Sequence, residues 1–120
     1  MKTLEKLKIG GTSLLNLLFP IGSIHFSVSP TNPSNYFGGT WVAWGSGRVP
    51  VGVNKNDESF NSVEKTGGEK THALKFDELP LASFTAYSSS GDWTYVGLNP
   101  EKPHNNLQPY ITCYMWKRTK

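Results

Sequence analysis

The chain has 120 residues, the size of one small domain, which excludes most large enzyme scaffolds. Only 37% of its residues are hydrophobic, and its 12 glycines and 8 prolines favour turns over helices. The formal net charge of +3 comes from scattered lysines and arginines, so we expect no nucleic-acid partner. The one cysteine, Cys113, cannot form an internal disulfide and indicates a fold made under reducing conditions.

Leucines at helical spacing predict a short N-terminal helical segment over residues 1–18, in two pieces separated by Gly10 and Gly11. We expect Ser13 to cap the second piece and Pro20 to end it. The apolar run 14–19 is too short to cross a bilayer and lacks a cleavage site, so we expect no targeting segment and no membrane insertion. So short a segment needs something to pack on, either its own domain or other copies.

The next stretch predicts short strands bounded by turns. Alternation of apolar and polar residues indicates strands over 24–28 and 48–54, and the aromatic run 40–45 indicates another. Two prolines and two asparagines make residues 29–35 a loop. We expect Trp41, Trp44 and Trp116 to form core, because all three lie in predicted strands.

The second half is predicted to be richer in loops. Residues 54–70 read as a surface loop pinned by Phe60 and Val63, followed by a strand over 71–76 and a turn over 77–80. Residues 87–95 predict a hairpin with a Ser/Gly tip, and residues 110–116 the strongest strand. The fold class is therefore α+β and mostly β, with residues 19–120 as a small glycine-rich β domain.

Signals for catalysis and for metal binding are weak. His72 and Asp77 could form a triad with a serine, but no nucleophile-elbow sequence accompanies them, so we expect no enzyme. His25, His72 and His104 could meet in space, but no pair has a chelating spacing. We predict no metal and no other cofactor.

Aromatic residues around the predicted hairpin tip are the candidate binding site. Tyr87, Trp93 and Tyr95 flank the tip, and aromatic side chains on a loop can stack on sugar rings or anchor a protein partner. Ser90 and Asp92 could hydrogen-bond hydroxyl groups. The alternative, that the aromatic side chains pack back onto the domain, remains open.

Several blocks of the chain, taken together and in order, resemble the C-terminal domain of bacteriophage baseplate structural proteins and short tail fibres. The resemblance spans about residues 15–120. The blocks are residues 19–28 (FPIGSIHFSV), 31–33 (TNP), 36–41 (YFGGTW), 47–54 (GRVPVGVN), 63–74 (VEKTGGEKTHAL), 78–80 (ELP) and 104–119 (HNNLQPYITCYMWKRT).

The resemblance implies a virion component at the tail tip or baseplate, built as an intertwined homotrimer together with other tail or baseplate proteins. It also implies adsorption to the host surface, with residues 1–18 as a trimerisation segment. The chemistry of the aromatic tip favours a host-surface glycan or another surface receptor as the partner. Related sequences often carry Ser-His-x-His after the Glu-x-Pro block, where this chain has residues 81–84. Ala82 and Phe84 replace the two histidines, which implies that the metal site of some tail fibres is absent here.

The functional hypothesis from the sequence is host-surface recognition and adsorption by a tail-fibre or baseplate tip domain. The alternative is a purely structural trimerisation or capping module of the baseplate. A surface hydrolase would need His72 or His104 to meet a carboxylate and a nucleophile. Because such domains end longer chains, we expect these residues to be a fragment of a longer protein.

Overall fold

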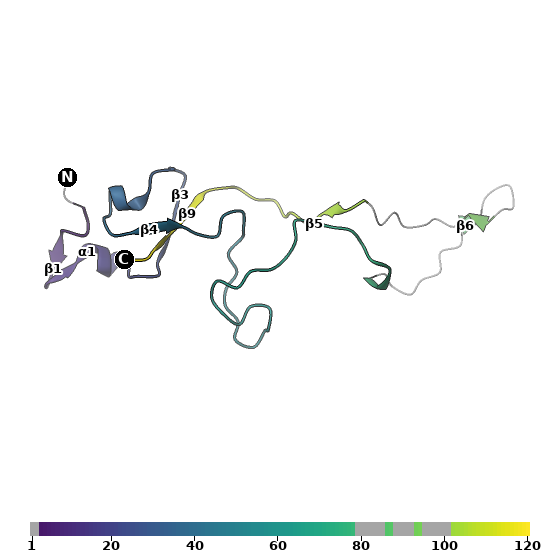
Figure 1. The fold of residues 1–120 in the computed structure, drawn as a ribbon, viewed down its shortest axis with the longest axis horizontal. Coiled ribbons are helices and arrows are strands. Elements are labelled where there is room, and N and C mark those ends of the chain that lie inside the picture. Colours follow the sequence, from purple (N-terminus) through teal and green to yellow (C-terminus); the bar gives the residue numbers. More distant parts are fainter. Residues whose placement is uncertain (1–2, 79–85, 88–92, 95–101) are drawn as a thin grey trace. The chain divides into compact units, whose positions relative to one another are not determined.

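The computed structural model describes residues 3–78, 86–87, 93–94 and 102–120. The chain forms two compact units, one made of Met1–Val63 with Ile111–Lys120 and the other of Glu64–Tyr110. The described elements are mostly short strands, with a single five-residue α-helix among them, which confirms the predicted mostly β class (Figure 1). No helix in the described ranges is long and apolar enough to cross a membrane.

The first unit is organised by a three-stranded antiparallel sheet. Its order is β3 (Ile24–Ser27), β9 (Tyr114–Arg118) and β4 (Trp41–Ala43), so the C-terminal strand lies between two strands from the first half of the chain (Figure 1). The predictions for 24–28 and 40–45 are confirmed. The predicted C-terminal strand begins later than expected, because its residues pair only from Tyr114 onward.

The N-terminal prediction is correct for the second leucine piece and wrong for the first. Residues before the glycines form a hairpin of β1 (Lys8–Ile9) and β2 (Thr12–Ser13), since Gly10 and Gly11 both take positive φ and close a tight turn. The helix α1 covers Leu14–Leu18. Ser13 caps it as predicted, with the Asn16 N–H donating to its Oγ at 3.2 Å.

The core of the first unit is small and aromatic. Among the described residues, the buried apolar side chains are Leu15, Pro33 and Trp41. The prediction for Trp41 is therefore confirmed, while Trp44 and Trp116 are only half-buried. One face of the sheet packs on aromatic rings with centroids 4.6–6.3 Å apart. This aromatic cluster consists of Phe19, His25, Tyr36, Phe37 and Trp41.

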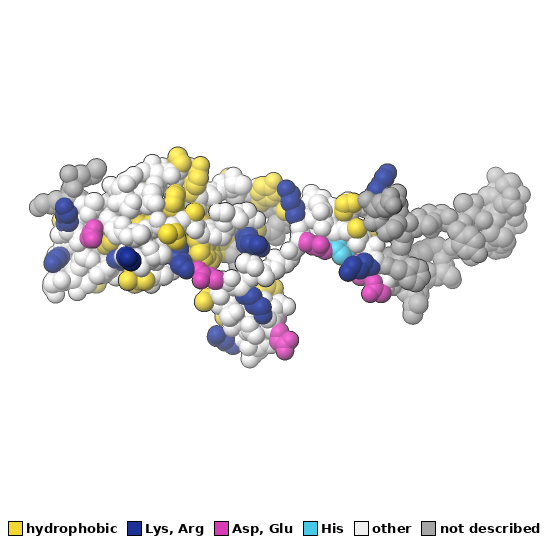
Figure 2. All heavy atoms as spheres, in the orientation of Figure 1, with side chains coloured by type: hydrophobic (Ala, Val, Ile, Leu, Met, Phe, Trp, Pro, Cys, Tyr) yellow, Lys and Arg dark blue, Asp and Glu magenta, His cyan; other side chains and the backbone are white. Residues whose placement is uncertain are grey.

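The opposite face of the sheet has no covering layer among the described residues. Register places Phe26 opposite Met115 and Val42 opposite Lys117, and directly opposed residues share a face. Phe26 is 53% exposed and Val42 is 44% exposed. Figure 2 shows hydrophobic side chains on the surface of this unit.

The predicted strand over 48–54 is wrong. Val49, Val51 and Val53 alternate as predicted but lie in irregular backbone and are 46–64% exposed. Alternation creates a strand only where a second strand supplies hydrogen bonds, and no described segment of this chain pairs with it. The loop over 54–70 is confirmed, but Phe60 and Val63 do not pin it, since both are exposed.

The second unit contains two small antiparallel pairs. Strand β5 (Thr71–His72) is shorter than predicted and pairs with β8 (His104–Asn105), for which the sequence gives no signal. A single 3₁₀ turn, η2 (Phe76–Glu78), follows, within the predicted turn region. Strand β6 (Ala86–Tyr87) pairs with β7 (Trp93–Thr94), which confirms the predicted hairpin.

Candidate functional site

The backbone of the predicted hairpin brings two of the five candidate receptor contacts together. Register places Tyr87 directly opposite Trp93 on β6 and β7. Ser90, Asp92 and Tyr95 lie outside the described residues, as do Ala82 and Phe84. The structure therefore pairs the two aromatic positions that flank the tip.

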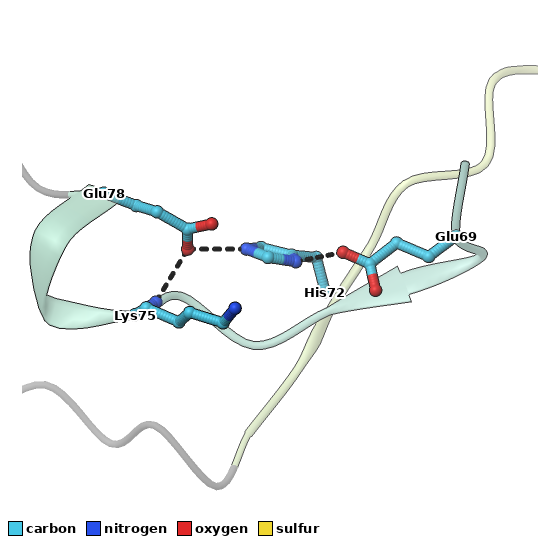
Figure 3. A network of polar contacts seen from close by, with 4 residues as sticks. All are labelled: Glu69, His72, Lys75 and Glu78. Carbon is cyan, nitrogen blue, oxygen red and sulfur yellow. Dashed lines mark hydrogen bonds and ion pairs between the residues drawn. The ribbon is translucent and has the colours of Figure 1, made fainter. Parts of the chain in front are cut away.

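A polar network is centred on His72 of β5, in the second unit (Figure 3). Its Nδ1 contacts Oε1 of Glu69, and its Nε2 lies 2.7 Å from Oε2 of Glu78 at the end of η2. The same Glu78 oxygen accepts a hydrogen bond from the backbone N–H of Lys75 at 2.7 Å. One carboxylate thus binds both the imidazole and the backbone that leads into the turn.

The carboxylates set the protonation of this network. Hydrogen bonds to Glu78 and then to Glu69 raise the pKa of His72 above its ordinary value of 6.5. The Lys75 N–H and then His72 lower the pKa of Glu78 below its ordinary value of 4.5. The network therefore favours an imidazolium between two carboxylates.

The imagined triad of His72 and Asp77 is not formed. The carboxylates at His72 come from Glu69 and Glu78, three residues before it and six after it, and they occupy both ring nitrogens. Neither Glu69 nor Glu78 is among the site residues predicted from the sequence. The spacing of Glu69 was a usable signal, but Glu78 reaches His72 only through the turn at η2.

Two of the three histidines come together. The rings of His72 and His104 are opposed across β5 and β8, edge to face, with centroids 5.8 Å apart. His25 belongs to the aromatic cluster of the first unit, where its Nε2 lies 3.4 Å from the Tyr36 hydroxyl. No group of three or more His, Cys, Asp or Glu side chains in the described ranges could hold a metal ion.

An open depression in the first unit carries no evident chemistry. It has a volume of about 390 Å³ and is lined by Val28, Thr112, Cys113 and Tyr114. Cys113 is a free, exposed thiol. The lining includes no carboxylate, imidazole or basic side chain that could act on a substrate.

Comparison with known proteins gives a family match over most of the chain. Residues 14–96 match the family described as "Baseplate structural protein Gp10, C-terminal domain". The chain is also similar to the baseplate wedge protein gp10 of Enterobacteria phage T4, at 26% identity over 154 residues. That similarity covers 89% of this chain and only 26% of the relative, so the chain spans about a quarter of the curated protein it matches.

The family match and the resemblance found in the sequence cover overlapping but different ranges of the chain. The family match ends at residue 96, whereas the resemblance seen in the sequence continues through residues 104–119. Strand β9, at the C-terminal end, completes the sheet that β3 and β4 begin within the matched range. The chain belongs to the family of the C-terminal domain of baseplate structural protein Gp10, and its place is the phage baseplate in the virion.

Proposed function

We propose that this chain is a structural module of the baseplate that works as an intertwined homotrimer. The observation that carries the proposal is burial: of the described apolar side chains, only Leu15, Pro33 and Trp41 are buried. Large apolar side chains are instead exposed along residues 48–54 and on the uncovered face of the three-stranded sheet, which carries Phe26 and Val42. A chain of this kind gains stability by burying such surfaces against further copies.

A second copy of the chain is the occupant that best suits these surfaces. The alternating valines of residues 48–54 have strand character but no strand partner among the described residues, and a neighbouring copy could supply one by backbone pairing. Phe26 and Val42 could pack against the same neighbour. In the assembled tail we expect other baseplate proteins to be further partners.

The oligomeric state tests this proposal directly. The expected result is a mass three times that of the 13.3 kDa chain, measured by light scattering or native mass spectrometry at micromolar concentration. A monomer that unfolds cooperatively as one unit would contradict it. A dimer would contradict the threefold arrangement.

Host-surface contact through the β6–β7 hairpin is the second candidate function, with a surface glycan as the expected ligand. It is favoured by the register of Tyr87 and Trp93, which places two aromatic positions side by side at a loop. Ser90, Asp92 and Tyr95 complete the proposed contact. Weak single contacts would suffice, because three copies repeated around a tail raise the effective affinity.

Adsorption measurements separate the two functions. We expect Trp93→Ala to lower binding to host cells and to purified host surface polysaccharide about tenfold or more per site, given the usual contribution of an aromatic anchor at an interface. Tyr110→Ala, which removes a 66% exposed aromatic side chain outside the hairpin, is the matched control. Unchanged binding by a correctly assembled Trp93→Ala variant would contradict host-surface contact through the hairpin and would support only the structural function.

We also propose that the domain performs no catalysis. Both ring nitrogens of His72 are taken by carboxylates, so neither is free to remove a proton from a nucleophile. An assay for cleavage of host wall polymers tests this. Polymer cleavage that a His72→Gln variant loses would overturn it.

A further inference from the structure

We propose that His72 is a pH-sensitive clamp, which in its doubly protonated form ties strand β5 to the turn η2 and to the segment that precedes the strand. The three side chains belong to one continuous stretch, with Glu69 before the strand and Glu78 at the end of the turn (Figure 3). This inference concerns the second unit alone and does not depend on the oligomeric state or on host binding.

Hydrogen-bond stoichiometry is the first support. A carboxylate only accepts hydrogen bonds, and a neutral imidazole has one N–H and one acceptor nitrogen. Because Nδ1 faces Glu69 and Nε2 faces Glu78, both contacts are hydrogen bonds only when the ring carries two protons. Loss of either proton turns one contact into a lone pair facing a carboxylate, which is repulsive.

The backbone contact of Glu78 is the second support, since it connects protonation to conformation. Oε2 of Glu78 accepts from His72 and from the Lys75 N–H, so the position of this one oxygen closes the turn. The Glu78 N–H in turn donates to the Lys75 carbonyl at 3.1 Å. If Glu78 leaves a neutral His72, the Lys75 amide loses its acceptor.

The charged surroundings favour the clamped state. The titratable and charged groups that the structure places around His72 are Glu69, Glu78, Lys75 and His104. The attraction between the imidazolium and the two carboxylates outweighs the opposing effects of the nearby Lys75 and of the His104 ring across the strand pair. His72 is 20% exposed, against 37% for Glu78 and 59% for Glu69, so we expect salt to weaken the Glu69 contact more.

The pH window follows from the direction of each shift. Because the pKa of His72 is raised in the folded state, the stabilisation that His72 gives the clamp is complete below pH 6.5. It is lost as the pH rises through the higher pKa of the folded state. Because the pKa of Glu78 is lowered in the folded state, the stabilisation that Glu78 gives the clamp is present above pH 4.5. It is lost as the pH falls through the lower pKa of the folded state. The clamp is therefore closed at mildly acidic pH and opens on the alkaline side.

The experiment is a pH titration of the full chain, with imidazole shifts followed by NMR and amide protection followed by hydrogen exchange. We expect His72 to titrate above a free histidine, and the protection of the Lys75 amide, corrected for intrinsic exchange, to fall about fivefold as His72 loses its proton. A His72 midpoint at or below 6.5, or constant Lys75 protection through the His72 titration, would overturn the proposal.

Three variants show whether the carboxylates are the cause. Glu78→Gln should lower the His72 midpoint most and Glu69→Gln less, while His72→Gln should make Lys75 protection independent of pH over this range. His104→Gln is the control, and it should preserve the step in Lys75 protection. A step that persists in His72→Gln would assign it to another group and overturn the clamp.

Discussion

At the scale of single residues, the first unit depends on close approaches around the last strand. Arg118 is 6% exposed, and its guanidinium donates from Nη1 to the Phe19 carbonyl at 2.6 Å and from Nε to the main-chain oxygen of Lys120 at 2.8 Å. Gly39 lies against the same group, with φ of 72°. This buried cation thus connects main-chain oxygens at the end of the helix and in the C-terminal segment.

Gly39→Ala should destabilise the first unit more than Gly47→Ala. Both glycines have φ near 70°, so each alanine bears a similar backbone penalty of about 1–2 kcal/mol. A Cβ at Gly39 would lie 2.6 Å from the Lys120 carbonyl oxygen, whereas one at Gly47 meets nothing within 4 Å. Urea unfolding of the two variants measures the difference, and equal losses would show that the backbone at Gly39 moves freely.

Arg118→Ala should lower the free energy of unfolding by about 3 kcal/mol, because it removes two charge-assisted hydrogen bonds and takes this donor from the Phe19 carbonyl. The main-chain oxygen of Lys120 still accepts from the Thr40 N–H at 3.0 Å. The free energy of unfolding of Arg118→Lys should lie between those of Arg118→Ala and the wild type, since an ammonium group cannot reproduce the planar arrangement of guanidinium donors. Lys120→Ala keeps the main-chain oxygen that accepts from Arg118 and is the control, with a free energy of unfolding within about 0.5 kcal/mol of wild type. Calorimetry ranks the stabilities of the variants, and an Arg118→Ala variant as stable as the wild type would contradict this account.

At the scale of elements, short pieces of structure are held by side chains that satisfy backbone groups. The 3₁₀ turn η1 (Pro33–Asn35) begins with Asn32, whose Oδ1 accepts from the Ser34 N–H at 3.0 Å. Its Nδ2 donates to the carbonyl of Trp41 at 3.1 Å. One asparagine therefore caps a turn and fixes it to strand β4.

Substitutions of Asn32 should separate these two roles. Asn32→Ala loses both hydrogen bonds and should destabilise the unit by about 2 kcal/mol. Asn32→Ser keeps a cap oxygen but is too short to reach Trp41, so we expect about half that loss. Thermal unfolding checks the order, and equal losses from the two variants would mean that the cap contributes nothing.

The success of strand prediction also depended on a backbone partner. The alternation over 24–28 and the aromatic run 40–45 became β3 and β4 because β9 pairs with both. The equally clear alternation of Val49, Val51 and Val53 has no partner in the described chain and stayed irregular. Side-chain period gives the capacity to form a strand, and only pairing realises it.

At the scale of the whole molecule, exposed apolar surface is the feature that the proposed assembly must explain. If copies associate through residues 48–54, Val51→Asp should weaken association about tenfold or more for each buried contact, since burying a valine contributes about 1.5 kcal/mol. Val63→Asp is the control, because Val63 is a 77% exposed valine outside that segment. The mass at decreasing concentration is the measurement, and equal behaviour of both variants would contradict this interface.

The sequence by itself determined the mostly β class, the cap at Ser13, the strands that became β3 and β4, the β6–β7 hairpin and the family, because each depends on neighbouring residues or on ordered motifs. The tertiary structure decided that Gly10 and Gly11 close a hairpin, that residues 48–54 pair with no strand in the described part of the chain, and that Glu78 folds back to His72. These outcomes depend on which backbone and side-chain groups meet in space, and the spacing of residues along the chain does not specify that.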